Sequence, residues 1–157
     1  MPITIDALSA SLAQSAVRVW VDEEGGAPLR CCLRDSRGGE RVALVSATPP
    51  GPVGAYQESG PVFMHADGCD GANSRTYPDD FRRRQQVFRA YDAQGSIMGG
   101  ELVDAGNDQE AVAERLLADP AVAFLHTRNV VHGCYMLRRR RARCRTVPAA
   151  AVGAGGR

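Results

Sequence analysis

The chain has 157 residues, of which 44% are hydrophobic and 24% are charged, and its formal net charge is +1. These values suit one soluble globular domain and exclude a protein that binds nucleic acid through a strongly basic overall charge. No window approaches the roughly 18 apolar residues of a membrane span, and no basic stretch followed by an apolar block opens the chain. We therefore expect a cytoplasmic protein without a signal peptide.

The basic and sulfur-containing residues narrow the chemistry further. All 19 basic residues are arginine, so no lysine Schiff base can form. The cysteines are Cys31, Cys32, Cys69, Cys134 and Cys144. An odd number of cysteines without a signal peptide argues against a disulfide framework.

The first half of the chain predicts three strands. Residues 17–23 alternate apolar and polar side chains, residues 41–47 form a more buried run, and residues 61–66 form the third. Residues 48–60 lie between the second and third strands and are rich in proline and glycine, which predicts a loop.

The second half predicts two hairpins with a helix between them. Residues 87–104 read as a hairpin with Ala-Gln-Gly at its turn, and residues 122–129 pair with residues 134–139 in the second. Asn107 and Glu110 have the spacing of a capping box that opens the helix.

The order of these elements predicts an α+β fold. A strand, the helix and a further strand between residues 96 and 129 fit one β-α-β crossover. We predict a single domain over residues 1–145, with a mixed or mostly antiparallel sheet, one main helix and a short second helix near residues 78–86. Residues 146–157 are small and are expected to form a disordered tail.

Histidine, arginine and tyrosine side chains recur at strand positions and loop edges. Histidine transfers protons near neutral pH, and arginine clamps carboxylates or phosphates with two hydrogen bonds. The candidate catalytic residues are His65, His126, Glu58 and Tyr91, and the candidate substrate-binding residues are Arg89, Arg128, Asn129 and Tyr135. The alternative is a solvated sheet face, which also shows polar residues at every second position.

The histidines and cysteines raise two further alternatives, a zinc site and a reactive thiol. The available zinc ligands are His65, Cys69, His126, His132 and Cys134, with Cys31 and Cys32 elsewhere in the chain. No C-x2-C pair occurs, so we predict no cofactor and retain zinc only as an alternative. In a hairpin with a four-residue turn, Cys134 and His126 lie on opposite strand faces, so we expect Cys134 to be packed rather than reactive. Cys69 and Cys134 are the candidate thiols of the site, with no role assigned to them.

Residues 138–145, RRRRARCR, form the most basic stretch. Such runs bind phosphates, but only Tyr135 stands nearby as an aromatic, and acidic residues elsewhere balance the charge. We therefore interpret the run as the solvated end of the last strand, with no nucleic-acid partner. Phosphate-loop, Rossmann and serine-hydrolase motifs are also absent from the sequence.

Four stretches together resemble the bacterial domain of unknown function 1203. They are CLRDSRGGERVALVS, YQESGPVFMHADGC, VFRAYDAQGSI and ERLLADPAVAFLHTRNVVHGCYMLRR, in the family's order. The resemblance implies a self-contained small domain and names no activity. Its pattern includes Glu58, Gly60, Pro61, His65, Cys69, Arg89, Tyr91, Arg128, Asn129, Gly133, Cys134 and Tyr135. The family often reads Pro-Cys-Arg where this chain has Pro28-Leu29-Arg30, which leaves Cys31 as an incidental neighbour.

Three functional hypotheses follow. The first is an enzyme of specialised metabolism that acts on a small anionic organic molecule by histidine-assisted proton transfer with arginine anchoring. Isomerase, lyase, cyclase and hydrolase chemistry are not distinguished. The second is a non-catalytic module that binds a ligand or a protein, and the third is a structural zinc domain. We expect no membrane partner, and an uncapped edge strand leaves a homodimer as an alternative.

Overall fold

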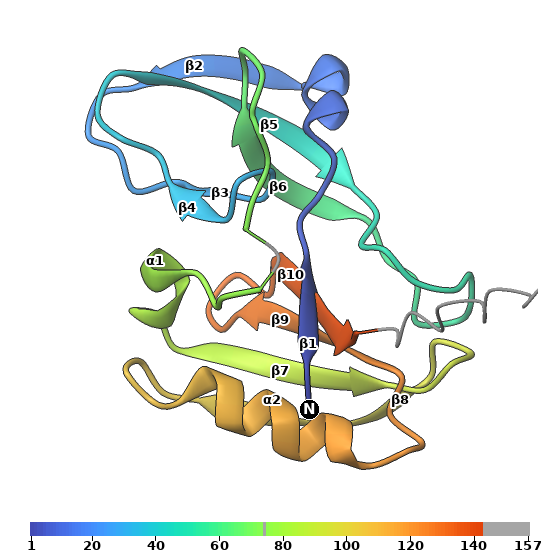
Figure 1. Ribbon diagram of the computed structural model, residues 1–157. Coiled ribbons are helices and arrows are strands. Elements are labelled where there is room, and N and C mark those ends of the chain that lie inside the picture. Colours follow the sequence, from blue (N-terminus) through green and yellow to red (C-terminus); the bar gives the residue numbers. More distant parts are fainter. Residues whose placement is uncertain (74, 143–157) are drawn as a thin grey trace, which may run out of the picture.

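A computed structural model describes residues 1–73 and 75–142 and contains two five-stranded sheets (Figure 1). Sheet A has the order β1 (Ile3–Asp6), β10 (Tyr135–Arg141), β9 (Phe124–Asn129), β7 (Gln86–Tyr91) and β8 (Ile97–Val103). Sheet B has the order β2 (Arg18–Asp22), β5 (Glu40–Ala47), β6 (Gly60–His65), β3 (Pro28–Leu29) and β4 (Arg34–Asp35). The helices are η1 (Ala10–Ser15), α1 (Asp79–Arg82) and α2 (Gln109–Ala118).

The predicted α+β fold with one main helix is wrong, because the protein is mostly β. The expected strands in residues 17–23, 41–47 and 61–66 are confirmed as β2, β5 and β6. The additional strands β1, β3 and β4 have only 4, 2 and 2 residues. Strands this short carry no readable alternation, and β1 pairs with β10 at the other end of the chain.

Helix α2 connects two strands that run in the same direction. Both β8 and β9 are antiparallel to β7, which lies between them, so the crossover expected between residues 96 and 129 spans one intervening strand. The helix begins one residue later than predicted. Its cap is Asp108, whose side chain accepts a hydrogen bond from the Ala111 amide at 3.0 Å.

The β9–β10 hairpin has the predicted register at its turn. Tyr135 pairs with Arg128, and the Asn129 amide donates to the Cys134 carbonyl at 2.9 Å. A bulge between Tyr135 and Leu137 then shifts the register along the rest of β10.

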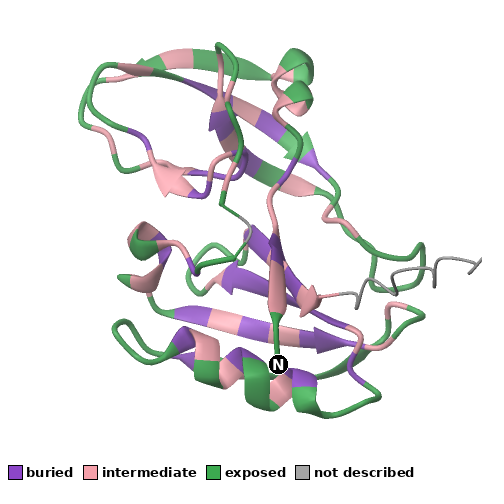
Figure 2. Ribbon diagram, viewed as in Figure 1, coloured by how far each residue is buried: buried purple, intermediate pink, exposed green. Residues whose placement is uncertain are grey.

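The buried residues form two apolar clusters, one for each sheet (Figure 2). In sheet A, Phe88 and Leu125 pack with Leu117 of α2. In sheet B, the cluster includes Val42 and Met64, and it also includes Tyr135 from β10 of sheet A. A sheet A side chain thus forms part of the sheet B core, which ties the two layers together.

The end of β10, which was predicted to be solvated, instead packs against the rest of the protein through its arginine side chains. Arg139 is 1% exposed, its Nη1 donates to the Gln109 carbonyl at 2.6 Å, and its guanidinium lies 4.9 Å from the centre of the Tyr77 ring. Arg141 donates to the Leu117 carbonyl at the end of α2, at 2.6 Å. The remainder of the basic run, from residue 143, and the predicted tail over residues 146–157 lie outside the described residues.

Among the described residues, no helix is both long enough and apolar enough to cross a membrane.

Asp6 supports the edge of sheet A by accepting hydrogen bonds from Arg138 and Arg140, each at 2.8 Å. Burial opposes ionisation of Asp6, but the bonds from Arg140 and Arg138 outweigh it and lower the pKa of the carboxyl group. We expect Asp6→Asn to reduce the free energy of unfolding by about 1–3 kcal/mol at neutral pH. The native pKa is lowered, so this contribution is present above the unfolded-state pKa of about 3.9 and is lost as the pH falls below it. Chemical denaturation near pH 7 and near pH 3 measures the difference, and a penalty that grows on acidification contradicts the assignment.

Candidate functional site

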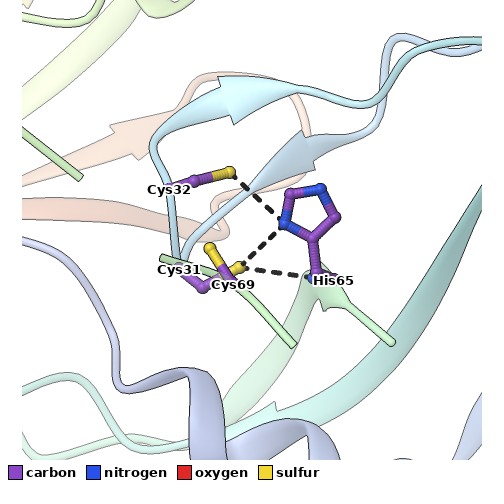
Figure 3. A group of neighbouring side chains, drawn as sticks. All are labelled: Cys31, Cys32, His65 and Cys69. Carbon is purple, nitrogen blue, oxygen red and sulfur yellow. Dashed lines mark hydrogen bonds between the residues drawn. The ribbon is translucent and has the colours of Figure 1, made fainter. Parts of the chain in front are cut away.

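Four side chains converge in sheet B and are here called the thiol cluster: Cys31, Cys32, His65 and Cys69 (Figure 3). Their sulfur and nitrogen atoms all lie within 4.8 Å of one another. His65 Nδ1 is 3.7 Å from the Cys31 sulfur and 3.6 Å from the Cys32 sulfur. Cys31 is buried and the other three are half-buried, so the cluster is shielded but lies close to the surface.

A short parallel pairing between β3 and β6 positions the first part of the cluster. Leu29 pairs with Phe63, and the amide of the next residue, Arg30, donates to the Phe63 carbonyl at 2.9 Å. Extending this register by two residues places Cys31 beside His65. The His65 amide accordingly donates to the Cys31 sulfur at 3.3 Å.

A tight turn and a loop supply the remaining thiols. The turn joins β3 to β4 and carries Cys32. It closes through a hydrogen bond from the Leu33 amide to the Leu29 carbonyl at 3.0 Å, and Leu33 has a φ of 58°, which is unusual for a branched apolar residue. Cys69 lies in the loop after β6, where its sulfur accepts a hydrogen bond from the Gly71 amide at 3.4 Å.

The three thiols differ in acidity because they interact with one another. A hydrogen bond with Cys32, together with the backbone N–H of His65, lowers the pKa of Cys31 to about 5 against the effect of burial. The same interaction with Cys31 raises the pKa of Cys32, and burial raises the pKa of Cys69. Among the three thiols, Cys31 is therefore the one whose thiolate form is favoured.

The far side of the His65 ring faces an ion pair. Arg34 Nη2 lies 2.9 Å from His65 Nε2, and Glu40 Oε1 lies 3.7 Å from the same nitrogen. Arg34 also donates two hydrogen bonds to Glu40, at 2.9 and 2.7 Å, which lowers the pKa of Glu40 to about 2. Since arginine can only donate, Nε2 accepts, and the ring proton lies on Nδ1, toward the thiols.

A second polar group, here called the arginine pair, lies between the sheets. Arg128 Nη2 and Arg89 Nη1 both donate to Glu58 Oε1, the latter at 3.3 Å. Arg128 also donates to the Gly133 carbonyl at 2.9 Å, and its side chain is 6% exposed, whereas Glu58 is 46% exposed. The Tyr91 hydroxyl lies 3.4 Å from Arg89 Nη1. One accessible carboxylate thus meets one buried and one half-buried arginine.

His126 lies next to this group in an aromatic environment. Its ring centroid is 4.8 Å from that of Tyr91 and 5.1 Å from those of Phe124 and Tyr135. Nε2 lies 2.9 Å from the Pro50 carbonyl, which can only accept, so the ring proton lies on Nε2. Burial lowers the pKa of His126 to about 4, so the ring is neutral at pH 7.

The structure divides the predicted site residues into three places. Tyr91, His126 and Tyr135 lie around the arginine pair and Glu58. His65 and Cys69 belong to the thiol cluster instead. The first group therefore comprises Glu58, Arg89, Tyr91, His126, Arg128 and Tyr135. Asn129 accepts from the His132 amide at 3.1 Å in the β9–β10 turn, and the Cys134 sulfur lies 3.7 Å from the His132 carbonyl. The functional roles assigned from the sequence stay predictions.

The sequence interpretation missed the contribution of Cys31 and Cys32. Cys31 is not an incidental neighbour, since its sulfur lies at the centre of the thiol cluster (Figure 3). Adjacent cysteines followed by the spacing His65-x3-Cys69 were the available signal. More than thirty residues separate the two cysteines from His65 in the sequence. They meet only in the folded chain, where β3 pairs with β6.

Comparisons with known proteins identify one family. A family model described as "Protein of unknown function (DUF1203)" matches residues 26–141, a range that includes both the thiol cluster and the arginine pair. No curated protein and no solved structure matches the chain.

The acidity of His126 can be tested directly. We expect its ring to stay neutral from about pH 8 down to about pH 5, because burial disfavours the charged form. Histidine ring resonances followed by NMR across this range measure it, with His132 in the exposed turn as an internal comparison. A midpoint for His126 near the ordinary value of about 6.5 contradicts the burial described here.

Proposed function

We propose that the protein binds one zinc ion through the thiol cluster. The chain belongs to the DUF1203 family of proteins of unknown function. The observation that carries the proposal is the convergence of three sulfur atoms and one imidazole nitrogen, all within 4.8 Å of one another. Three cysteines and one histidine form one of the usual ligand sets of structural zinc.

The distances inside the cluster support zinc in particular. Zinc bonds of about 2.3 Å to sulfur and about 2.0–2.1 Å to nitrogen place a sulfur and a nitrogen ligand about 3.6 Å apart in a tetrahedron. The two measured sulfur-to-Nδ1 distances are 3.7 and 3.6 Å. The ligand atoms that face His65 therefore already have the spacing of a zinc tetrahedron.

A zinc ion with four protein ligands has no open position for substrate, so the role we propose is structural. The ion would join the β3–β4 turn, the end of β6 and the following loop, which are the three segments that carry the ligands. Zinc binds cysteine as the thiolate, so protonated thiols would lose their protons to the solvent on binding. Zinc affinity therefore falls with decreasing pH.

The acid–base enzyme suggested by the sequence has less support from the contacts. It needs His65 and His126 in one site, but both ring nitrogens of His65 face the thiol cluster and the Arg34–Glu40 ion pair. The part of that hypothesis with a favourable geometry is the anchoring of an anion by Arg89 and Arg128. We therefore propose binding rather than catalysis for that region.

The zinc proposal predicts one equivalent of zinc in protein purified without chelators. Elemental analysis measures it, and cobalt substitution should add the absorption bands of a tetrahedral cobalt–thiolate centre. Cys32→Ser should reduce the bound metal to less than about half an equivalent and lower the thermal stability, because structural zinc contributes folding free energy.

Cys134→Ser is the matched control for this experiment. Cys134 is half-buried like Cys32 but lies outside the thiol cluster, so its variant should keep the full metal content. Equal metal content in the two variants contradicts the proposal. A stoichiometric disulfide within the cluster in freshly purified protein would likewise replace zinc binding with thiol redox chemistry.

Glu40 provides a second test, because a zinc-bound Nδ1 moves the ring proton of His65 to Nε2. The Arg34 guanidinium, which donates to Nε2 at 2.9 Å, would then have to shift so that Nε2 can donate to a carboxylate. The nearest carboxylate oxygen to that nitrogen is Glu40 Oε1, at 3.7 Å. A carboxylate behind a histidine ligand fixes the ring and strengthens the metal bond, so Glu40→Gln should weaken zinc binding about 10- to 100-fold.

Competition with a chromophoric chelator measures this affinity. Arg34→Gln removes the same ion pair but keeps the carboxylate, and it should change the zinc affinity less than Glu40→Gln. An equal loss in both variants would assign the effect to the ion pair rather than to His65.

A further inference from the structure

We propose that the arginine pair is a binding site for the carboxylate group of a small organic acid, and that Glu58 occupies this site when the ligand is absent. The site is separate from the thiol cluster and does not depend on zinc for its ligand chemistry. Arg89, Arg128 and Glu58 supply the contacts that carry the inference.

Glu58 forms the hydrogen bonds to the two arginines that we propose a ligand carboxylate would form. Both arginines donate to the same oxygen, Oε1, and no donor to Oε2 occurs among the described residues. Two guanidinium groups against one carboxylate leave an excess charge of one. Arginine binds carboxylates most strongly through paired hydrogen bonds to both oxygens, so this arrangement uses only part of the binding capacity of the pair.

The position of Glu58 also separates two cavities. One has a volume of about 20 Å³, roughly the space of one water molecule, and is lined in part by Tyr91, Phe124 and His126. The other has a volume of about 150 Å³ and lies beside Val62 and Tyr135. Pro49, Glu58 and Arg128 line both cavities. Movement of the Glu58 side chain would join them into one cleft with the guanidinium group of Arg128 on its wall.

Three residues that line these cavities carry buried polar atoms without partners. Arg128 Nε, His126 Nδ1 and the Tyr135 hydroxyl are all buried and have no hydrogen-bond partner among the described residues. These residues are 5%, 5% and 4% exposed. Buried polar groups without partners are costly, and a polar ligand is one way to satisfy them.

Glu58 is able to leave the site. It lies in the loop between β5 and β6 and is 46% exposed, whereas Arg128 is held in β9 with a second hydrogen bond to the Gly133 carbonyl at 2.9 Å. Exchange of Glu58 for a ligand therefore needs movement of a loop side chain only. The rigid strand keeps the arginine in place.

The chemistry of the site indicates a monocarboxylic acid with an apolar body. A carboxylate already fits between the guanidinium groups, and the aromatic rings of Tyr91 and Phe124 stack at 4.9 Å along the adjoining cavity. Apolar walls with a few convergent polar groups are typical of sites for small ligands, and displacement of Glu58 would supply the room that the closed site lacks.

Benzoate is a suitable probe, because it combines a carboxylate with an apolar ring. Glu58→Gln keeps the size of the side chain but removes the competing charge, so it should bind benzoate at least about tenfold more tightly than the unmodified protein, by removing an internal competitor. Calorimetry measures the affinity, and NMR shifts of the Arg89 and Arg128 side chains locate the bound probe. The zinc content of each sample is measured separately, so a failure of one proposal is distinguishable from a failure of the other.

Three controls decide the outcome. Glu114→Gln removes the same charge at an exposed position of α2 and should leave benzoate binding unchanged. Adding Arg89→Gln to Glu58→Gln should abolish the gain, and neutral benzamide should not bind. The proposal is overturned if Glu58→Gln and the unmodified protein bind benzoate equally, if benzamide binds as well as benzoate, or if inorganic phosphate binds more tightly.

Discussion

The short parallel pairing of β3 with β6 is the constraint on which the thiol cluster depends. It consists of one registered pair, Leu29 with Phe63, and strands of this length have little stability of their own. Strand β4 pairs only with β3, so the backbone ladder of sheet B holds the β3–β4 hairpin through this pair, and side-chain contacts such as Arg34 with Glu40 supply the rest. A metal ion bound by the turn of this hairpin and by the end of β6 would stabilise the contact between β3 and β6, where only one backbone pair is formed.

Arg30 extends this attachment to the other sheet. It stands between Leu29 and Cys31, is 3% exposed, and its Nε donates to the Tyr135 carbonyl of β10 at 2.7 Å. Its own carbonyl accepts from the Leu8 amide at 2.9 Å, in the segment that continues from β1 (Figure 1). Burial lowers the pKa of Arg30 only to about 10, so the guanidinium stays charged at neutral pH. One residue therefore links the cysteine turn, the N-terminal segment and sheet A.

Local sequence patterns predict the parts of this fold that are held by local interactions, and they fail where distant segments meet. Alternation located β2, apolar segments located β5 and β6, and the hairpin rule placed Arg128 opposite Tyr135. No local signal marks β1, β3 or β4, because each is too short to show a period and is held by a partner. The candidate site residues differ in the same way. Arg89 and Arg128 lie close together because their strands are adjacent, whereas His65 lies with the cysteines because the two-residue strand β3 pairs with β6.

Strand β6 relates the two proposed sites to each other. Glu58 comes just before its first residue, Gly60, and His65 is its last, so the strand spans about 17 Å between the loop of the arginine pair and the thiol cluster. The register of β6 against β5 determines the positions of both ends, from Ala47 opposite Gly60 to Val42 opposite His65. Ligation of His65 would hold one end of this strand. Glu58 would remain free to move at the other, since it belongs to the loop and not to the ladder. With a metal at one end of this strand and a displaceable carboxylate at the other, the two proposed sites would have different functions: one would maintain the fold, and the other would respond to a ligand.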